Sequence, residues 1–213
     1  MQKDTSKHTI QGIIRQFFYL LILVLVVLAF WQLGDVFKSS TVQEYGMFET
    51  MQSVVLLLIA VSFSCQAIRR SSCRPILLSL GLLALAALVR EQDAYFDKLI
   101  PSIGWTWCWS FPIAGMILLL RHRRTIGGVL LHFFHTNAFH MMVTAVVIII
   151  PIAQCLGHRS FLADLMGDTQ LDSHLMRRIL EEPIELLGYI QILLASVEYL
   201  FEQKAALAEE ERP

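Results

Sequence analysis

The stretch FFYLLILVLVVLAFW, residues 17–31, carries no charged side chain and decides the class of fold. A membrane-spanning α-helix needs roughly 20 predominantly apolar residues, and this run lies inside a longer apolar segment. The run exceeds the hydrophobic core of a cleavable signal peptide, and no small-residue cleavage site follows it, so we expect a retained span. The sequence therefore indicates an integral membrane protein.

The composition of the 213-residue chain favours the same class. Hydrophobic residues make up 55% of the chain, charged residues make up 16%, and the mean hydropathy is +0.57. A soluble domain usually carries about 25% charged residues. Four cysteines make no disulfide framework, and a net charge of -1 does not favour a nucleic-acid partner. We expect the lipid bilayer as the principal partner, together with a second membrane protein or a further copy of the chain.

Five further segments are long and apolar enough to be spans, which predicts an all-α, polytopic membrane protein with a six-helix bundle. Residues 1–213 then form a single membrane domain, because no internal repeat or linker interrupts them. The start of the fifth span is the least defined, because the apolar stretch 126–156 is longer than one crossing requires. Residues 157–182 are expected to form an outer loop with a short amphipathic helix. The predicted spans are residues 13–33, 47–68, 75–89, 103–120, 130–156 and 183–201.

The distribution of basic residues predicts the orientation, because short cytoplasmic loops retain lysine and arginine. With both termini inside, 11 of the 17 Lys and Arg residues lie on the cytoplasmic side and 6 on the other. The arginine-rich stretches 69–74 and 121–124 carry most of this difference. We therefore expect a plasma membrane protein, bacterial and located in the inner membrane, with both termini in the cytoplasm.

This topology places 12 of the 18 acidic residues on the outer side, where groups of them stand at the ends of the second, third and sixth spans. Glu181 and Glu185 are four residues apart and share one helix face. Ionisable groups just inside an apolar boundary are costly and normally face a bundle interior or a wet cavity. The predicted polar cluster consists of Glu49, Arg90, Glu91, Asp93, Glu181, Glu182 and Glu185.

Three interpretations of this cluster are open at the level of sequence. Arg90 forms a buried ion pair with Glu49 or Glu185, and the remaining acids are solvated. Alternatively, carboxylates from several helices bind a divalent cation. In the third interpretation, one carboxyl group is kept protonated by burial and acts as a general acid or base, or as a proton relay. The candidate metal ligands are Glu49, Glu91, Asp93 and Glu185.

A second polar feature lies in the predicted fifth span. On one continuous helix, His132, Thr136 and His140 follow one another at intervals of four residues and form an intramembrane stripe. The stripe is consistent with a metal or proton site, or with hydrogen bonds between neighbouring helices. If residues 126–135 instead form a cytoplasmic surface helix, His132 and His135 are interfacial. Haem is not expected, because every clearly intramembrane histidine lies on this one span.

The segments REQD, residues 90–93, and EEPIE, residues 181–185, resemble small bacterial multi-pass membrane proteins that carry an acidic pair after a middle helix and a similar entry to the last one. This resemblance implies a multi-pass fold and no particular activity. A comparison with polytopic zinc hydrolases of the alkaline ceramidase type does not extend to the last span, because that span contains no histidine.

Two functions follow from these features. In the first, an acidic cavity on the outer face binds a cation or a cationic small ligand, in transport, sensing or assembly of a complex. In the second, the chain is a membrane-embedded, metal-dependent hydrolase or transferase that acts on a lipid-linked substrate. The chain contains no Walker A, G-x-G-x-x-G or G-x-S-x-G motif, so nucleotide-driven transport and nucleophile-elbow chemistry have no support.

Overall fold

The computed structural model describes residues 2–32, 47–99, 104–158 and 173–210, which are helical apart from short turns and contain no strand. The expected all-α class is therefore confirmed. The predicted amphipathic helix of the outer loop falls largely on residues 159–172, which lie outside the described residues. The helices are α1 (Gln2–Gln32), α3 (Met47–Arg69), α4 (Arg74–Glu91), α5 (Asp93–Leu99), the 3-10 helix η1 (Gly104–Trp109), α6 (Ser110–Arg121), α7 (Arg123–Phe134), α8 (Asn137–Val147), the π-helix η2 (Ile148–Ala153), α9 (Gln154–Gly157) and α11 (Ser173–Glu210).

Four of the described helical segments have the length and apolar composition that a bilayer crossing requires, as in a membrane protein. They are Ile10–Phe30, Met47–Arg69, Asn137–Leu156 and Leu180–Ala206. The third and fourth predicted spans correspond to α4 and to the shorter apolar helix Thr106–Arg121, neither of which is among these four. The last helix begins well before Pro183, which lies inside α11 and not at its start as expected.

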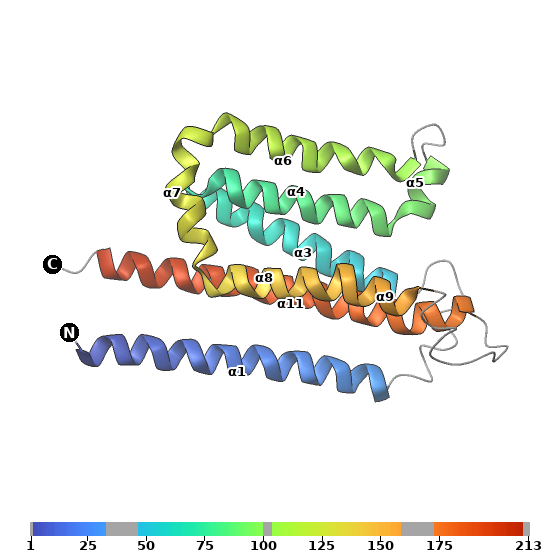
Figure 1. Cartoon of the computed structure of the whole chain (residues 1–213), viewed down its shortest axis with the longest axis horizontal. Helices are drawn as coiled ribbons and strands as arrows, with labels where there is room; N and C mark the ends of the chain where they lie inside the picture. Colours follow the sequence, from blue (N-terminus) through green and yellow to red (C-terminus); the bar gives the residue numbers. More distant parts are fainter. Residues whose placement is uncertain (1, 33–46, 100–103, 159–172, 211–213) are drawn as a thin grey trace.

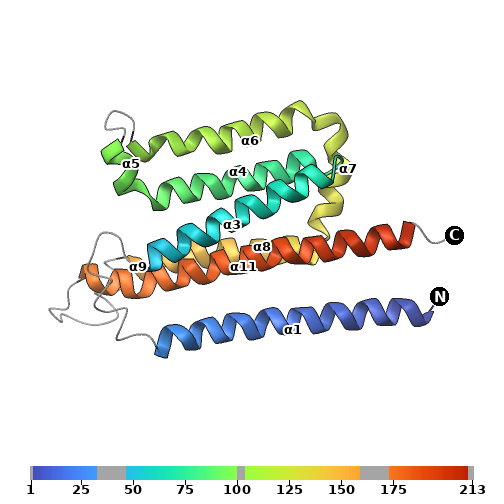
Figure 2. The same cartoon turned by 180° about the vertical axis from the view of Figure 1, so that it is seen from behind.

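The long helices run side by side, with α11 between α1 and α3 (Figures 1 and 2). Helix α11 packs against α1, α3, α8, η2 and α9, while α4 packs between α3 and α6. Both ends of the described chain lie at the same end of the bundle, which we call the terminal end. The opposite end, where α4 stops and α9 lies beside α11, is called the distal end.

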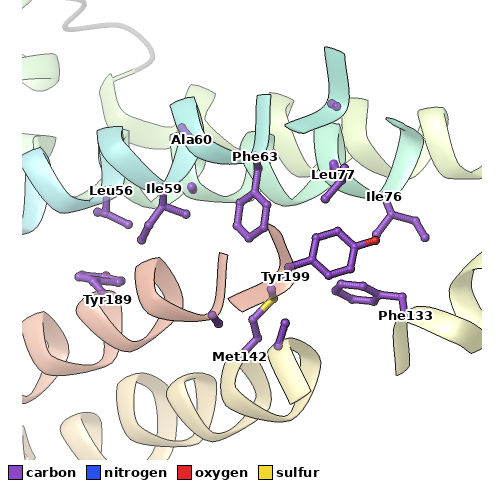
Figure 3. Packing of buried hydrophobic residues seen from close by; sticks show 14 of the residues in the cluster. Leu56, Ile59, Ala60, Phe63, Ile76, Leu77, Phe133, Met142, Tyr189 and Tyr199 are labelled. Atoms are coloured by element: carbon purple, nitrogen blue, oxygen red, sulfur yellow. The ribbon is translucent and has the colours of Figure 1, made fainter. Parts of the chain in front are cut away.

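The core is an apolar cluster shared by α3, α4, α7, α8, η2 and α11. Figure 3 shows Phe63 and Leu56 of α3 facing the tyrosines of α11, with Met142 of α8 on the other side. Tyr199 stacks edge-on against Phe133, with 5.4 Å between the ring centroids. In a membrane, where lipid is as apolar as a leucine side chain, such packing and interhelical hydrogen bonds hold helices together.

Small residues permit the closest helix contacts. The Ser79 hydroxyl on α4 donates to the carbonyl oxygens of Pro75 at 2.8 Å and Gly115 at 3.1 Å, which joins α4 to α6. On α11, a Cβ atom at Gly188 would collide with the side chain of Ile149 and would lie 3.3 Å from the carbonyl oxygen of Ala145. These positions therefore bring the helix backbones close together, as is typical of membrane bundles.

A π-helical segment widens the apolar stretch Asn137–Leu156 near the distal end. Pro151 lies inside η2, and it has no backbone N–H to donate to the preceding turn. The extra residue in the turn shifts the register of the helix, as π-bulges do. Ile149 and Ala153 are both buried, and Gln154 follows directly beside α11.

Candidate functional site

Six side chains from α4, α9 and α11 meet at the distal end. Four of them belong to the polar cluster predicted from the sequence, and two do not. We call this group the Glu185 cluster, and its members are Arg90, Glu91, Gln154, Glu181, Glu185 and Tyr189.

The charged core of the cluster is one guanidinium group shared by two carboxylates. The Nη2 atom of Arg90 lies 2.7 Å from Oε1 of Glu91 and 3.6 Å from Oε1 of Glu185. Arg90 and Glu91 end α4, whereas Glu185 lies on α11, so the pair of Arg90 with Glu185 joins two helices. The Tyr189 hydroxyl donates to the same Glu91 oxygen at 2.9 Å and adds a second link between these helices.

The amide of Gln154 holds the two carboxylates of α11 side by side. Its Nε2 atom donates to Oε1 of Glu181 at 2.9 Å and to Oε1 of Glu185 at 3.1 Å. Glu181, Glu185 and Tyr189 recur at four-residue intervals and therefore share one face of α11. The register shift at η2 determines which face of the following turn meets α11, and Gln154 occupies that position.

Burial divides the cluster into an enclosed side and an open side. Glu181 and Glu185 are buried, and the Glu91 side chain is only 11% exposed. The Arg90 side chain is 49% exposed, so solvent reaches the cluster from the α4 side. Buried carboxylates are costly without hydrogen-bond donors, and Gln154, Tyr189 and Arg90 provide them here.

The remaining predicted members of the polar cluster lie at the same end of the bundle. Glu49 is half-buried in the first turn of α3, and Asp93 is exposed at the start of α5. The backbone carbonyl of Glu182 accepts a hydrogen bond from Nε2 of the buried Gln52 at 3.1 Å. The ion pairs of Arg90 are with Glu91 and Glu185, and not with Glu49.

The proposed metal ligands do not form a metal centre in the part of the chain that the structure describes. Among these residues, no three histidine, cysteine, aspartate or glutamate side chains are grouped so that they could hold a metal ion. The set Glu49, Glu91, Asp93 and Glu185 is therefore not assembled. Arginine, tyrosine and glutamine side chains surround the carboxylates that do converge.

The predicted stripe of His132, Thr136 and His140 is wrong as a single helix face. Helix α7 ends at Phe134 and α8 begins at Asn137, because Thr136 caps α8: its Oγ1 atom accepts from the backbone nitrogen of Phe139 at 3.1 Å. The segment that could cross a membrane here is Asn137–Leu156, so it begins at Asn137 and not near residue 130 as predicted.

The break leaves the predicted stripe residues on two helices that run in different directions (Figure 1). His132 is exposed on α7, as the surface-helix alternative expects. Nδ1 of His140 lies 2.8 Å from the carbonyl oxygen of Thr136 within the first turn of α8. These local contacts explain the polar residues without a shared site.

Sequence reasoning missed a second ionic cluster near the terminal end, here called the Glu198 cluster. Arg15 of α1 forms a two-pronged ion pair with Glu198 of α11, with both N–O distances at 2.9 Å. The Tyr19 hydroxyl donates to the same carboxylate at 2.9 Å, and the Glu198 side chain is fully buried. The signal was available, because both charged residues fall inside predicted spans, where an ionisable group implies a partner.

The two clusters are separated by apolar packing along α11. Between Tyr189 and Ser196 the helix carries mainly apolar residues, and the amide of Gln191 donates to the carbonyl oxygen of Met141 at 3.2 Å. Farther along α11, the hydroxyl oxygen of Ser196 lies 3.0 Å from the hydroxyl oxygen of Ser62 on α3. The described residues therefore provide no continuous hydrogen-bonded path from one cluster to the other.

Comparison of the chain with models of protein families, with curated proteins and with solved structures gives no match.

The ion pairs of Arg90 lead to a stability prediction. We expect Arg90→Ala to lower the free energy of unfolding in detergent by about 1–3 kcal/mol, because Glu91 and Glu185 lose their shared cation. The effect stays below that of a fully buried pair, since half of the Arg90 side chain is exposed. In Arg90→Ala combined with Glu185→Gln, part of the loss should be recovered. Strictly additive losses in this double-mutant cycle would contradict the coupling.

Proposed function

We propose that the chain is a six-span protein of the bacterial inner membrane whose Glu185 cluster binds a cation or a small cationic ligand at the outer face. The proposed role is transport, sensing or assembly of a complex, with the bilayer and a further membrane protein or a second copy as partners. The observation that carries the proposal is the sharing of one guanidinium group by two enclosed carboxylates.

The positions of the basic side chains support the proposed orientation. Arg69 ends α3, Arg74 begins α4 and Arg121 ends α6, all at the terminal end, where both described chain ends also lie. Arginine at this density favours the cytoplasmic side. The Glu185 cluster is at the opposite end and would therefore face outward.

The packing of α4 and α6 supports six spans. Helix α4 has 18 residues, which correspond to about 27 Å at 1.5 Å per residue and are close to the thickness of the hydrocarbon core. It lies between α3 and α6, and its axis is roughly aligned with the long axis of the bundle, as are the four longer segments (Figure 2). A helix so placed crosses the same layer as its neighbours, and the charged pair at its end would reach the interface.

The electrostatic argument concerns Glu91 and Glu185. When both are ionised, they carry one more negative charge than Arg90 neutralises. An additional cation beside two partly desolvated carboxylates is favoured more strongly than one in bulk water, because the effective dielectric constant is lower. The exposed edge of Arg90 marks the side from which a ligand can approach.

Ligand-dependent thermal stability tests this proposal. Purified protein in detergent would be melted with Na⁺, K⁺, Mg²⁺, Ca²⁺, Mn²⁺, Zn²⁺ and a series of organic ammonium ions, with elemental analysis of the same samples. A bound cation at 100 times its Kd stabilises the folded state by about 2.7 kcal/mol. We expect such a shift in the native protein and its loss in Glu185→Gln.

The matched control is Asp97→Asn, which removes one negative charge from an exposed position of α5 at the same end. This control should keep the shift. The absence of any shift in the native protein, or an equal shift in Glu185→Gln, would contradict the proposal. A stoichiometric divalent metal bound to the native protein would instead favour the alternative function, a membrane-embedded metal-dependent hydrolase or transferase.

A further inference from the structure

Six arginines gather at the terminal end, on the two turns that flank α4 and α6. Ser79 of α4 contacts Gly115 of α6, which sets the relative level of these helices. Arg74 lies five residues from Ser79, and Arg121 lies six residues from Gly115, so they are about 7.5 Å and about 9 Å beyond this contact in the same direction. The six residues are Arg69, Arg70, Arg74, Arg121, Arg123 and Arg124.

These arginines have no acidic partner among the described residues. Among the described residues, the arginines that form ion pairs are Arg15 and Arg90, and neither belongs to this group of six. The sequence around the arginines also lacks acids, because no aspartate or glutamate occurs in residues 50–90 or 98–163. Five of the six arginines are exposed, and only Arg70 is half-buried. The terminal end therefore presents several unneutralised guanidinium groups together.

Helix α7 adds an apolar surface next to this charge. It runs across the ends of the other helices between α6 and α8 (Figures 1 and 2). Its buried side chains, Ile126 and Phe133, face the core, while Leu131 is 61% exposed and Phe134 is 41% exposed. Leu131 and Phe134 are three residues apart and share one exposed face.

The chemistry of this end indicates its ligand. We propose that the six arginines and the exposed face of α7 bind anionic phospholipids, with the guanidinium groups on the phosphates and Leu131 and Phe134 among the acyl chains. An amphipathic helix that lies at the end of a membrane bundle, with arginines at its start and exposed apolar side chains beyond them, has the composition of an interfacial helix. Guanidinium forms two-pronged hydrogen bonds with phosphate, which arginine supplies better than lysine.

A soluble polyanion fits the same surface less well. It would neutralise the positive charge of the arginines but would leave Leu131 and Phe134 in water. A lipid satisfies both parts at once, because its phosphate and its acyl chains lie next to each other at the depth where α7 lies. This inference is independent of the Glu185 cluster, which is at the opposite end of the bundle.

Lipid titration of the full chain tests the assignment. Detergent-solubilised protein would be titrated with phosphatidylglycerol, phosphatidylcholine and inorganic phosphate, with bound lipid counted by native mass spectrometry and affinity measured with a fluorescent phosphatidylglycerol. We expect tighter binding of phosphatidylglycerol than of phosphatidylcholine. The variant R121Q/R123Q/R124Q should weaken phosphatidylglycerol binding about tenfold or more, since each basic residue near a membrane surface adds to the attraction.

The charge-preserving variant R121K/R123K/R124K is the matched control and should retain most of the binding. A second variant, L131S/F134S, should weaken lipid binding. Inorganic phosphate should not change lipid binding by the native chain or by this variant. Equal affinity for the two lipids in the native chain would overturn the proposal. Unchanged phosphatidylglycerol binding in R121Q/R123Q/R124Q, or competition by inorganic phosphate at millimolar level, would overturn it as well.

Discussion

Glu198→Ala is expected to lower the free energy of unfolding in detergent by about 3–5 kcal/mol, the range for removing one partner of a buried ion pair. The Glu198 side chain is fully buried, and it receives both prongs of the Arg15 guanidinium and the Tyr19 hydroxyl. Without it, Arg15 stays inside an apolar span with no anion. The loss should appear in equilibrium unfolding with a denaturing detergent and as a lower Tm.

The substitution Glu198→Ala should also weaken the attachment of α1 to the bundle. Most of the described side chains of residues 10–32 of α1 are exposed, and the contacts of these residues with the rest of the chain lie at the middle of the helix and in its last turn. At the middle, Arg15 and Tyr19 belong to the Glu198 cluster, and in the last turn Phe30 packs edge-on against Phe48 at 5.3 Å between centroids. Loss of the ionic contact therefore leaves weaker contacts to hold the helix, chiefly the Gln16 amide against the Met141 sulfur and the packing of Phe30.

Two further variants make this test specific. Leu25→Ala changes an exposed position of the same helix and should have little effect on stability. In a double-mutant cycle, Arg15→Gln and Glu198→Gln should show a coupling of about 1–3 kcal/mol. If Glu198→Ala and Leu25→Ala lower stability equally, the ion pair does not hold α1.

Gly188→Ala is the second substitution with a large expected effect, about 1–3 kcal/mol of destabilisation, the usual range for overpacking a close contact. The new methyl group would collide with the side chain of Ile149. It would also approach the carbonyl oxygen of Ala145 to 3.3 Å, so the helices must separate. This cost opposes the usual gain from replacing glycine by alanine within a helix. The comparison of Tm values in detergent measures the net effect.

The partner side chain offers a rescue. Ile149→Ala removes the two Ile149 atoms that a Cβ at position 188 would meet and leaves only the approach to the carbonyl oxygen of Ala145. The double variant should therefore be more stable than the sum of the two single losses predicts. Gly128→Ala is the control, because a Cβ there meets no atom within 4 Å. Destabilisation by Gly128→Ala as large as that by Gly188→Ala would show that the collision is not the cause.

The sequence predicts four charged members of the Glu185 cluster, Arg90, Glu91, Glu181 and Glu185. Once the spans alternate, the end of one helix at Arg90 and the beginning of another at Glu181 must share a side of the membrane, and burial of charge then favours pairing. Gln154 and Tyr189 are harder to predict, because uncharged polar residues in apolar segments carry little information on direction. The register shift at Pro151 adds a rotation that periodicity alone does not reveal.

The break before α8 shows why the stripe was mispredicted. Apolar content favours one long helix through residues 130–156. The Thr136 hydroxyl, however, can accept from a free backbone N–H at a helix start, whereas threonine is neutral or unfavourable in a helix interior. The carboxylate of Glu202 strengthens this start, since it accepts from the backbone nitrogen of Asn137 at 2.8 Å. That partner is 65 residues away in sequence, so local patterns cannot reveal it.

The central place of α11 bears on how the chain is assembled during synthesis. Ribosomes deliver the helices in order, and Arg15 precedes its partner by 183 residues. The backbone groups at the start of α8 and the guanidinium group of Arg15 have their carboxylate partners on the last helix. Until that helix enters the bilayer, the earlier ones hold polar groups that lipid cannot satisfy. Completion of the bundle is thus tied to the end of translation, and a truncated chain would expose these groups to membrane quality control.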